Sequence, residues 1–469
     1  MPTVNHGDLV ELEIEKFADK GKSLARLDGY VIFVEGAVPG DRVKAYIYNT
    51  KSNYAEAKLD TLLTPSDLRT TPRCRYADDC GGCKWQHVQY EAQLEMKRQS
   101  VAEVFEHHTG FEDVPVRETM GSPKRFYYRN KMDFDFSADR WLTRNEIDTG
   151  QDFDTDFALG LHVPGNFYKV LDLQECHLHS EFSARLVNGI RAFVKEQGWA
   201  PWDIRNHEGF LRHLVLRSGE RTGDFMVNLV TYGAPMERIS AFADFLQEEF
   251  PTVTTFVHTN HTGKSQNPEG ETQIVFGPGV IYDEIGDYRF EISPDAFFQT
   301  NTLQAERLYE VARDFADLRP SDRLYDLYCG AGTISLFMSE HVREVVGVEL
   351  VEAAVENART NAAHNEVDNC TFVSGDMKEV FTPSFVATHG DPDVLIVDPP
   401  RAGMHKDVVA QIADLAPDRF VYVSCNPQTQ ARDLEHLRDD YAIEAVQPVD
   451  MFPHTPHIET VVRLTLKDD

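Results

Sequence analysis

The sequence has no long hydrophobic run. None of its segments approaches the roughly 18 consecutive apolar residues that a membrane-spanning helix needs. The first residues, Met1–His6, also lack the basic region followed by an apolar region that marks a secretory signal. We therefore expect a cytoplasmic protein with no membrane partner, and we take a monomer as the default.

Basic residues are scarce. The 469 residues include 46 Lys and Arg against 77 Asp and Glu, for a net charge of −31. Because phosphate repels an acidic surface, this balance alone argues against a nucleic-acid partner. Alternatively, the acidity is an adaptation to a salty cytoplasm, where screening shortens charge interactions. One basic island, residues 124–131, interleaves four cations with three aromatics, which suits stacking on bases and phosphate contacts; an ordinary strand with solvated lysines is the competing interpretation.

Cysteine is also sparse, with seven residues in the chain. Disulfides are rare in cytosolic proteins, so paired bridges are not expected. Cys74, Cys80 and Cys83 nevertheless fall within ten residues, and Cys176 offers a fourth thiol. Four cysteines can hold zinc or an iron–sulfur cluster. The segment has one Cys-x2-Cys knuckle where zinc sites more often have two, and the pattern by itself leaves both metals open.

The first segment, residues 1–65, alternates short apolar strands with glycine turns. Residues 10–14 and 43–47 alternate apolar with polar side chains, and residues 31–34 form a compact apolar run. Five short strands in this length predict a small β-barrel of the oligonucleotide-binding (OB) type, with a structural β-module as the alternative. Residues 66–292 are mixed, with a helix predicted over 90–106 and neighbouring strands over 212–217 and 225–230.

The last segment, residues 293–469, has a regular pattern of alternating strands and helices. Apolar strands are predicted at 324–328, 345–348, 394–397 and 420–423, and helices at 302–316, 352–363, 406–415 and 430–438. This repetition indicates an α/β fold, in which helices cover a parallel sheet of Rossmann-like type.

A cofactor site is predicted at the first two of these strands. The strand at 324–328 runs into Gly330-Ala331-Gly332, where glycines allow close approach to a ligand. The next strand ends in Glu349, 19 residues after Gly330, a spacing that suits a carboxylate on ribose hydroxyls. Because the third glycine of the dinucleotide fingerprint is absent, an adenosyl cofactor fits better than NAD. Asp398, between an apolar strand and two prolines, is predicted to face a ligand.

Cys425 directly follows the apolar strand at 420–423 and Ser424. Open α/β sheets place their ligands at the carboxyl ends of the strands, so this thiol is a candidate nucleophile. Its competing interpretation is a small buried packing residue.

Five ordered segments resemble the RNA uracil-5-methyltransferases and are most similar to the RumA-like branch that acts on 23S ribosomal RNA. They are Phe297–Asn301, Asp326–Gly332, Asp398–Gly403, Ser424–Pro427 and Met451–Glu459. The resemblance implies that Cys425 attacks C6 of a uracil and that Glu459 removes the C5 proton. It also implies four positions that bind S-adenosylmethionine: Gln299, Tyr328, Glu349 and Asp398.

The same resemblance implies a [4Fe–4S] cluster on Cys74, Cys80, Cys83 and Cys176, and a TRAM-like RNA-binding barrel at 1–65. The central region, 66–292, would carry the cluster and the domain at 293–469 the chemistry, with the helix near 90–115 packed on the catalytic domain. We expect 23S ribosomal RNA as the partner. The alternatives are a uridine in the tRNA T-loop as substrate, or a non-catalytic iron–sulfur RNA-binding protein; the presence of both Cys425 and Glu459 argues against the latter.

Overall fold

The computed structural model describes residues 4–18 and 21–467, whose first part is a six-stranded sheet. Its strands are β1 (Leu9–Glu13), β2 (Lys16–Phe17), β3 (Ser23–Leu27), β4 (Tyr30–Glu35), β5 (Arg42–Thr50) and β6 (Tyr54–Thr64), in the order β1-β5-β6-β4-β3-β2. The alternation at Val43, Ala45 and Ile47 is confirmed, since all three side chains are buried on one face.

The prediction of a closed barrel is wrong for the described part of this sheet. There, β1 and β2 remain its edges, because no strand pairing joins β1 to the far side. Strand β1 has five residues, and the chain then turns into β2. Between the two strands, the Glu15 N–H donates a hydrogen bond to the Leu24 carbonyl of β3 at 2.9 Å, and within the residues described this contact does not extend into a strand pairing between β1 and β3.

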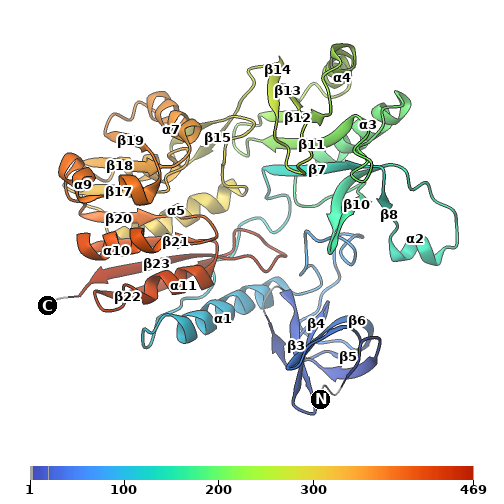
Figure 1. The fold of residues 1–469 in the computed structure, drawn as a ribbon, viewed down its shortest axis with the longest axis horizontal. Coiled ribbons are helices and arrows are strands. Elements are labelled where there is room, and N and C mark those ends of the chain that lie inside the picture. Colours follow the sequence, from blue (N-terminus) through green and yellow to red (C-terminus); the bar gives the residue numbers. More distant parts are fainter. Residues whose placement is uncertain (1–3, 19–20, 468–469) are drawn as a thin grey trace.

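Helix α1 (Tyr90–His108) connects the first sheet to the last part of the chain. It packs against α11 (Pro427–Glu435) and β22 (Tyr441–Val449), as Figure 1 shows. Val101 and Phe105 are fully buried in the core that contains Phe420. The buried stripe of α1 also includes Gln93 and Lys97.

The middle of the chain forms an eight-stranded sheet. Its strands are β7 (Lys131–Ser137), β8 (Arg140–Trp141), β9 (Ala158–Val163), β10 (Asn166–Asp172), β11 (Leu211–Ser218), β12 (Phe225–Thr231), β13 (Thr255–Asn260) and β14 (Glu271–Phe276), with the helices α2 (Arg144–Asp148), α3 (Glu181–Glu196) and α4 (Met236–Glu249). The predicted neighbours β11 and β12 are confirmed as an antiparallel pair. The apolar sides of α3 and α4 pack on one sheet face, through residues such as Leu186, Phe242 and Leu214. Asp135 and His213, which are register partners, lie on the other face.

A hairpin, β15 (Ile281–Ile285) and β16 (Tyr288–Ile292), precedes the seven-stranded sheet of the last part. The strands of that sheet are β17 (Arg323–Leu327), β18 (Glu344–Glu349), β19 (Cys370–Ser374), β20 (Val394–Val397), β21 (Arg419–Ser424), β22 and β23 (Glu459–Leu466). Their order is β19-β18-β17-β20-β21-β23-β22, with β23 antiparallel to its neighbours. The predicted parallel α/β sheet is confirmed, and an antiparallel pair is added at one edge.

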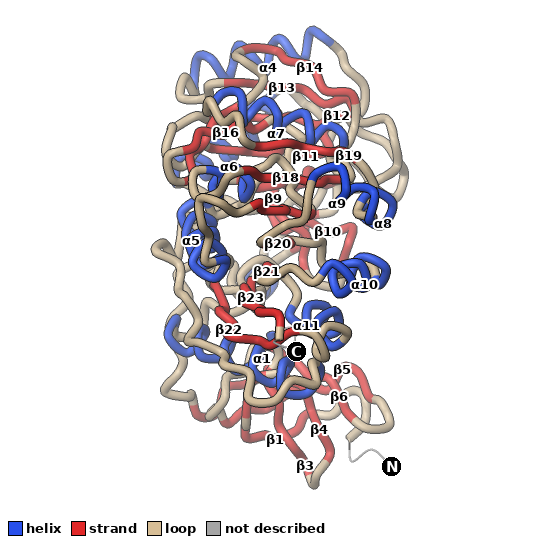
Figure 2. The backbone as a smooth tube through the Cα atoms, turned by 90° about the vertical axis from the view of Figure 1, so that its left-hand side faces the viewer, coloured by secondary structure: helices blue, strands red, loops and turns tan. Residues whose placement is uncertain are grey.

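Helices cover both faces of this sheet, as Figure 2 shows for α5 on one side and α8 to α10 on the other. The remaining helices are α5 (Thr302–Ala316), α6 (Thr333–Ser339), α7 (Glu352–His364), α8 (Met377–Val380), α9 (Pro383–His389) and α10 (Lys406–Leu415). The helix predicted at 430–438 begins at Pro427 instead, because the Asn426 side chain caps it and proline is favoured at the first helical position. No helix within 4–18 and 21–467 is both long and apolar enough to cross a membrane.

Candidate functional site

The carboxyl ends of four neighbouring strands converge on one edge of the catalytic sheet. Leu327 of β17 is in register with Val348 of β18 and with Val397 of β20, which is in register with Tyr422 of β21. The strands are parallel, so the residues that follow them emerge at the same edge, beside the switch in strand order between β17 and β20. Those residues include Tyr328, Glu349, Asp398 and Cys425.

The turn after β17 presents its backbone toward this edge. Tyr328 has a φ of 69°, an uncommon conformation for a non-glycine residue, and Gly332 caps α6 with a φ of 77°. A Cβ at Gly332 would lie 3.0 Å from the Ala358 side chain, so the tight packing requires glycine. Glu349 accepts hydrogen bonds from the Gly330 N–H at 3.2 Å and the Val351 N–H at 2.9 Å. The main chain thus holds a partly exposed carboxylate beside the glycine turn.

Two further carboxyls lie near this edge, Asp326 within β17 and Asp398 directly after β20. Asp326 is fully buried and accepts a hydrogen bond from the Ser335 hydroxyl at 2.5 Å. Burial raises the pKa of Asp326 to about 7. Burial, with the charge of Asp326 adding to it, also raises the pKa of Asp398 to about 7. Both groups therefore titrate near neutrality, as carboxyls at functional sites often do.

Cys425 and Glu459 are brought face to face by the antiparallel pairing of β21 and β23. Ser424 is in register with Thr460, so the residues one step further along each strand lie opposite each other. Glu459 is only 6% exposed, and burial raises its pKa well above the usual range, with Asp398 adding to the effect. Burial also raises the pKa of the Cys425 thiol to about 11, reinforced by Glu459 and Asp398.

Arg401 opposes these shifts, because its guanidinium lowers the pKa of the Cys425 thiol by charge and by hydrogen bonding. The Arg401 carbonyl accepts a hydrogen bond from the Asn426 side chain at 3.1 Å, which ties the loop after β20 to the loop after β21. Gln430 accepts from the Thr460 hydroxyl at 2.6 Å and donates to the Tyr422 carbonyl at 2.9 Å. No sequence pattern predicts a role for Arg401 or Gln430, although Arg401 stands within the segment Asp398–Gly403.

The loop that leads into Glu459 is held by helix α1. Asp450 accepts hydrogen bonds from the Lys97 ammonium at 2.5 Å and the Tyr90 hydroxyl at 2.8 Å. The side chains of Lys97 and Asp450 are 1% and 0% exposed, so this is a fully buried ion pair. His454 is bound through its backbone: its N–H donates to Gln93 at 2.9 Å. No sequence pattern predicts these contacts, because the partners lie more than 350 residues apart.

The loop that carries Gln299 is fixed by the central sheet. The Asn130 side chain donates to the Gln299 carbonyl at 2.8 Å, and Arg217 donates to the Ala296 carbonyl at 2.7 Å. These contacts place the backbone of Gln299 and leave its side chain partly exposed.

The basic island at 124–131 precedes β7 mainly as a loop, rather than as the strand that was the competing interpretation. Much of it is engaged within the protein. Tyr128 is 3% exposed, and the Phe126 ring stacks on His454 with centroids 4.4 Å apart. Lys124 pairs with Glu220, and Arg125 pairs with Glu91. The island therefore packs against the loops that carry His454 and Gln299, and fewer of its rings are available to stack on bases than the sequence suggests.

The four predicted metal ligands, Cys74, Cys80, Cys83 and Cys176, pack against one apolar core and are free thiols. Burial is the main cause of their raised pKa values, about 11 for Cys74 and about 12 for Cys83, and charge on the neighbouring sulfurs adds to it. Backbone N–H groups point at two sulfurs, from Tyr76 to Cys74 and from Gly82 to Cys80, both at 3.4 Å. Within the described ranges, no group of three or more such side chains is arranged to hold a metal ion.

Comparison with known proteins places this geometry in context. Residues 281–467 match the family model described as tRNA (Uracil-5-)-methyltransferase, and residues 3–59 match that of the TRAM domain. Proteins described as uncharacterized RNA methyltransferases are 41% identical in Bacteroides thetaiotaomicron, over 96% of this chain and 100% of that protein, and 42% identical in Chlorobaculum tepidum, over 97% and 96%.

A solved structure shares the arrangement of most of the chain. It is the Pyrococcus abyssi tRNA (uracil-54, C5)-methyltransferase in complex with S-adenosyl-L-homocysteine, which matches with a TM-score of 0.76 and 30% identity over 97% of this chain and 100% of that chain. Together with the carboxyl-edge site, these matches show that the chain belongs to the S-adenosylmethionine-dependent RNA uracil-5-methyltransferase family.

Proposed function

We propose that the protein methylates C5 of a uridine in 23S ribosomal RNA through a covalent adduct between Cys425 and C6 of the uracil. The observation that carries this proposal is the placement of Cys425 opposite Glu459, one step beyond the Ser424–Thr460 pair of β21 and β23, at the sheet edge where the glycine turn and Glu349 lie. A nucleophile and a proton acceptor are thus held beside each other at one edge of the sheet.

Cys425 and Glu459 act at different steps of the proposed reaction. The Cys425 thiolate adds to C6, and the electron pair of the C5–C6 double bond moves toward C5 and O4. S-adenosylmethionine supplies the methyl group that C5 takes up. Glu459 then accepts the C5 proton, and the released electron pair reforms the double bond and expels Cys425 as thiolate.

Glu459 is well suited to the last step. Burial gives its carboxylate a high proton affinity, so the proton is taken up readily. Addition of Cys425 to C6 converts a thiolate beside Glu459 into a neutral thioether. A neighbouring negative charge raises the pKa of a carboxyl group. Loss of the thiolate charge therefore lowers the pKa of Glu459, which favours its ionised form at the step where the C5 proton is removed.

Gln299, Tyr328, Glu349 and Asp398 are the proposed S-adenosylmethionine contacts. Glu349 would accept from the ribose hydroxyls, since its carboxylate is already oriented by the Gly330 and Val351 N–H groups. Gly332 packs closely against Ala358 and Phe372, which fixes the turn, whereas a Cβ at Gly330 would meet no atom within 4 Å, so that glycine leaves open the space that the cofactor would approach.

Cys74, Cys80, Cys83 and Cys176 are the proposed ligands of a [4Fe–4S] cluster. The support is a set of four thiols in one apolar core with backbone N–H groups directed at sulfur. A four-iron cluster is larger than a single ion, so its ligands stand further apart than those of a zinc site. Its role in this proposal is architectural.

We accordingly divide the chain into 1–65, 66–292 and 293–469, with α1 packed on the catalytic part.

A uridine in the tRNA T-loop is the second candidate substrate, favoured by the overall similarity to the archaeal tRNA (uracil-54, C5)-methyltransferase. Methyl transfer to 23S ribosomal RNA, to tRNA and to free uridine, measured with labelled S-adenosylmethionine, separates the candidates. Transfer to none of them would instead support a non-catalytic RNA-binding protein.

The covalent mechanism has its own test in Glu459→Gln. This variant should accumulate a protein–RNA adduct that survives a denaturing gel, because the C5 proton is no longer removed. An inactive variant that forms no adduct would show that Glu459 is not the base.

A further inference from the structure

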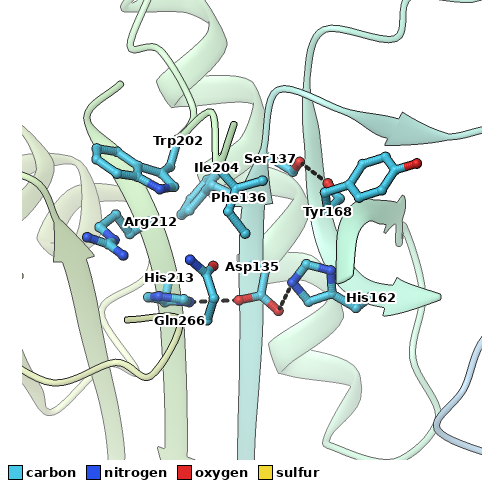
Figure 3. Close-up of a pocket in the computed structure, with 10 residues that line it drawn as sticks. All are labelled: Asp135, Phe136, Ser137, His162, Tyr168, Trp202, Ile204, Arg212, His213 and Gln266. Carbon is cyan, nitrogen blue, oxygen red and sulfur yellow. Dashed lines mark hydrogen bonds and ion pairs between the residues drawn. The ribbon is translucent and has the colours of Figure 1, made fainter. Parts of the chain in front are cut away.

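A small pocket lies in the central sheet, apart from the catalytic edge (Figure 3). Its enclosed part has room for the centre of one water-sized group, about 10 Å³, inside a hollow of about 280 Å³ that opens to solvent. The lining residues come from β7, β9, β10, β11 and nearby loops, and include Asp135, His162, Trp202, Arg212 and His213. The enclosed space therefore fits a single oxygen atom of a ligand.

A β-bulge directs two consecutive side chains into this pocket. Leu211 pairs with Thr231 and His213 with Val230, so β11 has an extra residue, Arg212, at this point. In a regular strand Arg212 and His213 would point to opposite faces. The bulge brings both to the pocket, and bulges commonly re-aim side chains beside functional sites.

Three buried nitrogen atoms of the pocket have no hydrogen-bond partner within residues 4–18 and 21–467: Trp202 Nε1, Arg212 Nε and His213 Nε2. Their residues are 5%, 1% and 5% exposed. The Trp202 and Arg212 nitrogens can only donate; because His213 Nδ1 already donates to Asp135, His213 Nε2 donates in the imidazolium form. Leaving a buried donor without a hydrogen bond is costly, so donors gathered in one pocket indicate a ligand atom that accepts.

The charges around the pocket favour an anion. Figure 3 shows Asp135 between two imidazoles, with its Oδ1 atom 2.7 Å from His213 Nδ1 and its Oδ2 atom 3.5 Å from His162 Nε2. Asp135 is therefore engaged on both oxygens. Arg212 stacks over Trp202 at 4.4 Å and donates to backbone carbonyls, including that of His261 at 3.1 Å. Among the described residues Arg212 forms no ion pair with a carboxylate, so its buried positive charge is left for an anion to balance.

The pocket lies on the face of the central sheet that also contacts the loop carrying Gln299. His213 and Arg217 are four residues apart on β11 and so point to the same face. Arg217 donates to the Ala296 carbonyl, in the loop that carries Gln299. At about 3.3 Å per residue, the pocket lies roughly 13 Å along β11 from that contact. A strand of RNA bound at the catalytic edge can extend this far.

We propose that the donors of Trp202, Arg212 and His213 bind a phosphate oxygen of the RNA backbone outside the catalytic centre. This proposal rests on the proposed function, because it takes RNA as the substrate. The phosphate oxygen enters the enclosed part, and the rest of the phosphodiester stays in the open hollow. It accepts hydrogen bonds that are otherwise missing, and its charge balances Arg212.

The proposal is tested with Trp202→Phe, which keeps the ring under Arg212 and removes only the N–H, and with His213→Asn, which keeps a donor toward Asp135 and removes the Nε2 atom. Equilibrium binding of labelled substrate RNA should weaken about tenfold in each, the effect of losing one hydrogen bond to a charged group. Trp199→Phe is the matched control, since Trp199 is equally buried in the opposite, helix-covered face. Thermal melts of all three variants check that the fold is kept.

A second arm identifies the source of the anion. If inorganic phosphate raises the melting temperature of the wild type and not of Trp202→Phe, while RNA affinity is equal in both, the pocket takes free phosphate and the proposal is wrong. If neither ligand distinguishes the two proteins, the pocket holds water only, which also overturns it. Binding is measured without methyl transfer, so a failure here leaves the methylation assays, and with them the proposed function, unaffected.

Discussion

The buried ion pair between Lys97 and Asp450 is expected to control both stability and the placement of Glu459. Replacing Lys97 with Met leaves the Asp450 carboxylate fully buried, with the Tyr90 hydroxyl and the Phe452 N–H as its remaining donors. Removing one partner of a buried pair costs about 3–5 kcal/mol, because the other charge stays desolvated. We expect Lys97→Met to lower the free energy of unfolding by that amount and to reduce methyl transfer.

The double variant Lys97→Met/Asp450→Leu separates the charge from the packing. Replacing both members of a buried pair by apolar side chains is often nearly neutral. The double variant should therefore be more stable than Lys97→Met, with a coupling energy of about 3 kcal/mol in the double-mutant cycle. Urea unfolding followed by tryptophan fluorescence measures this well, since the Trp85 ring lies 5.9 Å from the Lys97 ammonium.

Lys16→Met is the matched control, because Lys16 of β2 forms an exposed ion pair with the same helix. Lys16 pairs with Glu103 of α1, but the two side chains are 54% and 56% exposed. An exposed pair contributes roughly 0–1 kcal/mol. If Lys97→Met costs no more than this control, or if the two changes in the double variant are simply additive, the buried pair does not hold the loop as argued.

Three further outcomes are expected. Cys425→Ala should abolish methyl transfer and retain RNA binding, measured on the same RNA; normal turnover would end the covalent mechanism. Arg401→Met should raise the pKa of the Cys425 thiol above about 11, because the guanidinium favours the thiolate, so the pH profile of thiol alkylation should move upward; a downward shift would contradict the charge assignment. Anaerobically purified protein should be brown and contain about four irons per chain, lost in Cys83→Ala; stoichiometric zinc would refute the cluster.

Much of the catalytic fold could be predicted because its signals are local. The apolar run at 394–397 is β20 as predicted, and the helices at 302–316 and 406–415 begin and end where their patterns do. Strands buried on both faces are continuous apolar runs, and amphipathic helices follow the 3.6-residue period, so neighbouring residues suffice. The helix 90–106 was also predicted, but its buried stripe was not, since Gln93 and Lys97 interrupt the apolar pattern.

In the site, too, residue types could be predicted from the sequence, whereas their positions relative to one another could not. Residue type and order determined which side chains are candidates, since a thiol at a strand end, a glycine turn and a carboxylate 19 residues later are readable in sequence. That Cys425 lies opposite Glu459 depends on the pairing of β21 with β23, whose register is set by contacts between residues more than 30 positions apart.

Tertiary structure alone decided the remaining features. These features are the ion pair between Lys97 and Asp450, the bulge that directs Arg212 and His213 toward the same pocket, and the open edge of the first sheet. Each depends on the distance between groups that the chain brings together only by folding. Burial, which sets the cost of an unpaired charge and the pKa of a buried acid, is likewise a property of the packed molecule and not of the residue.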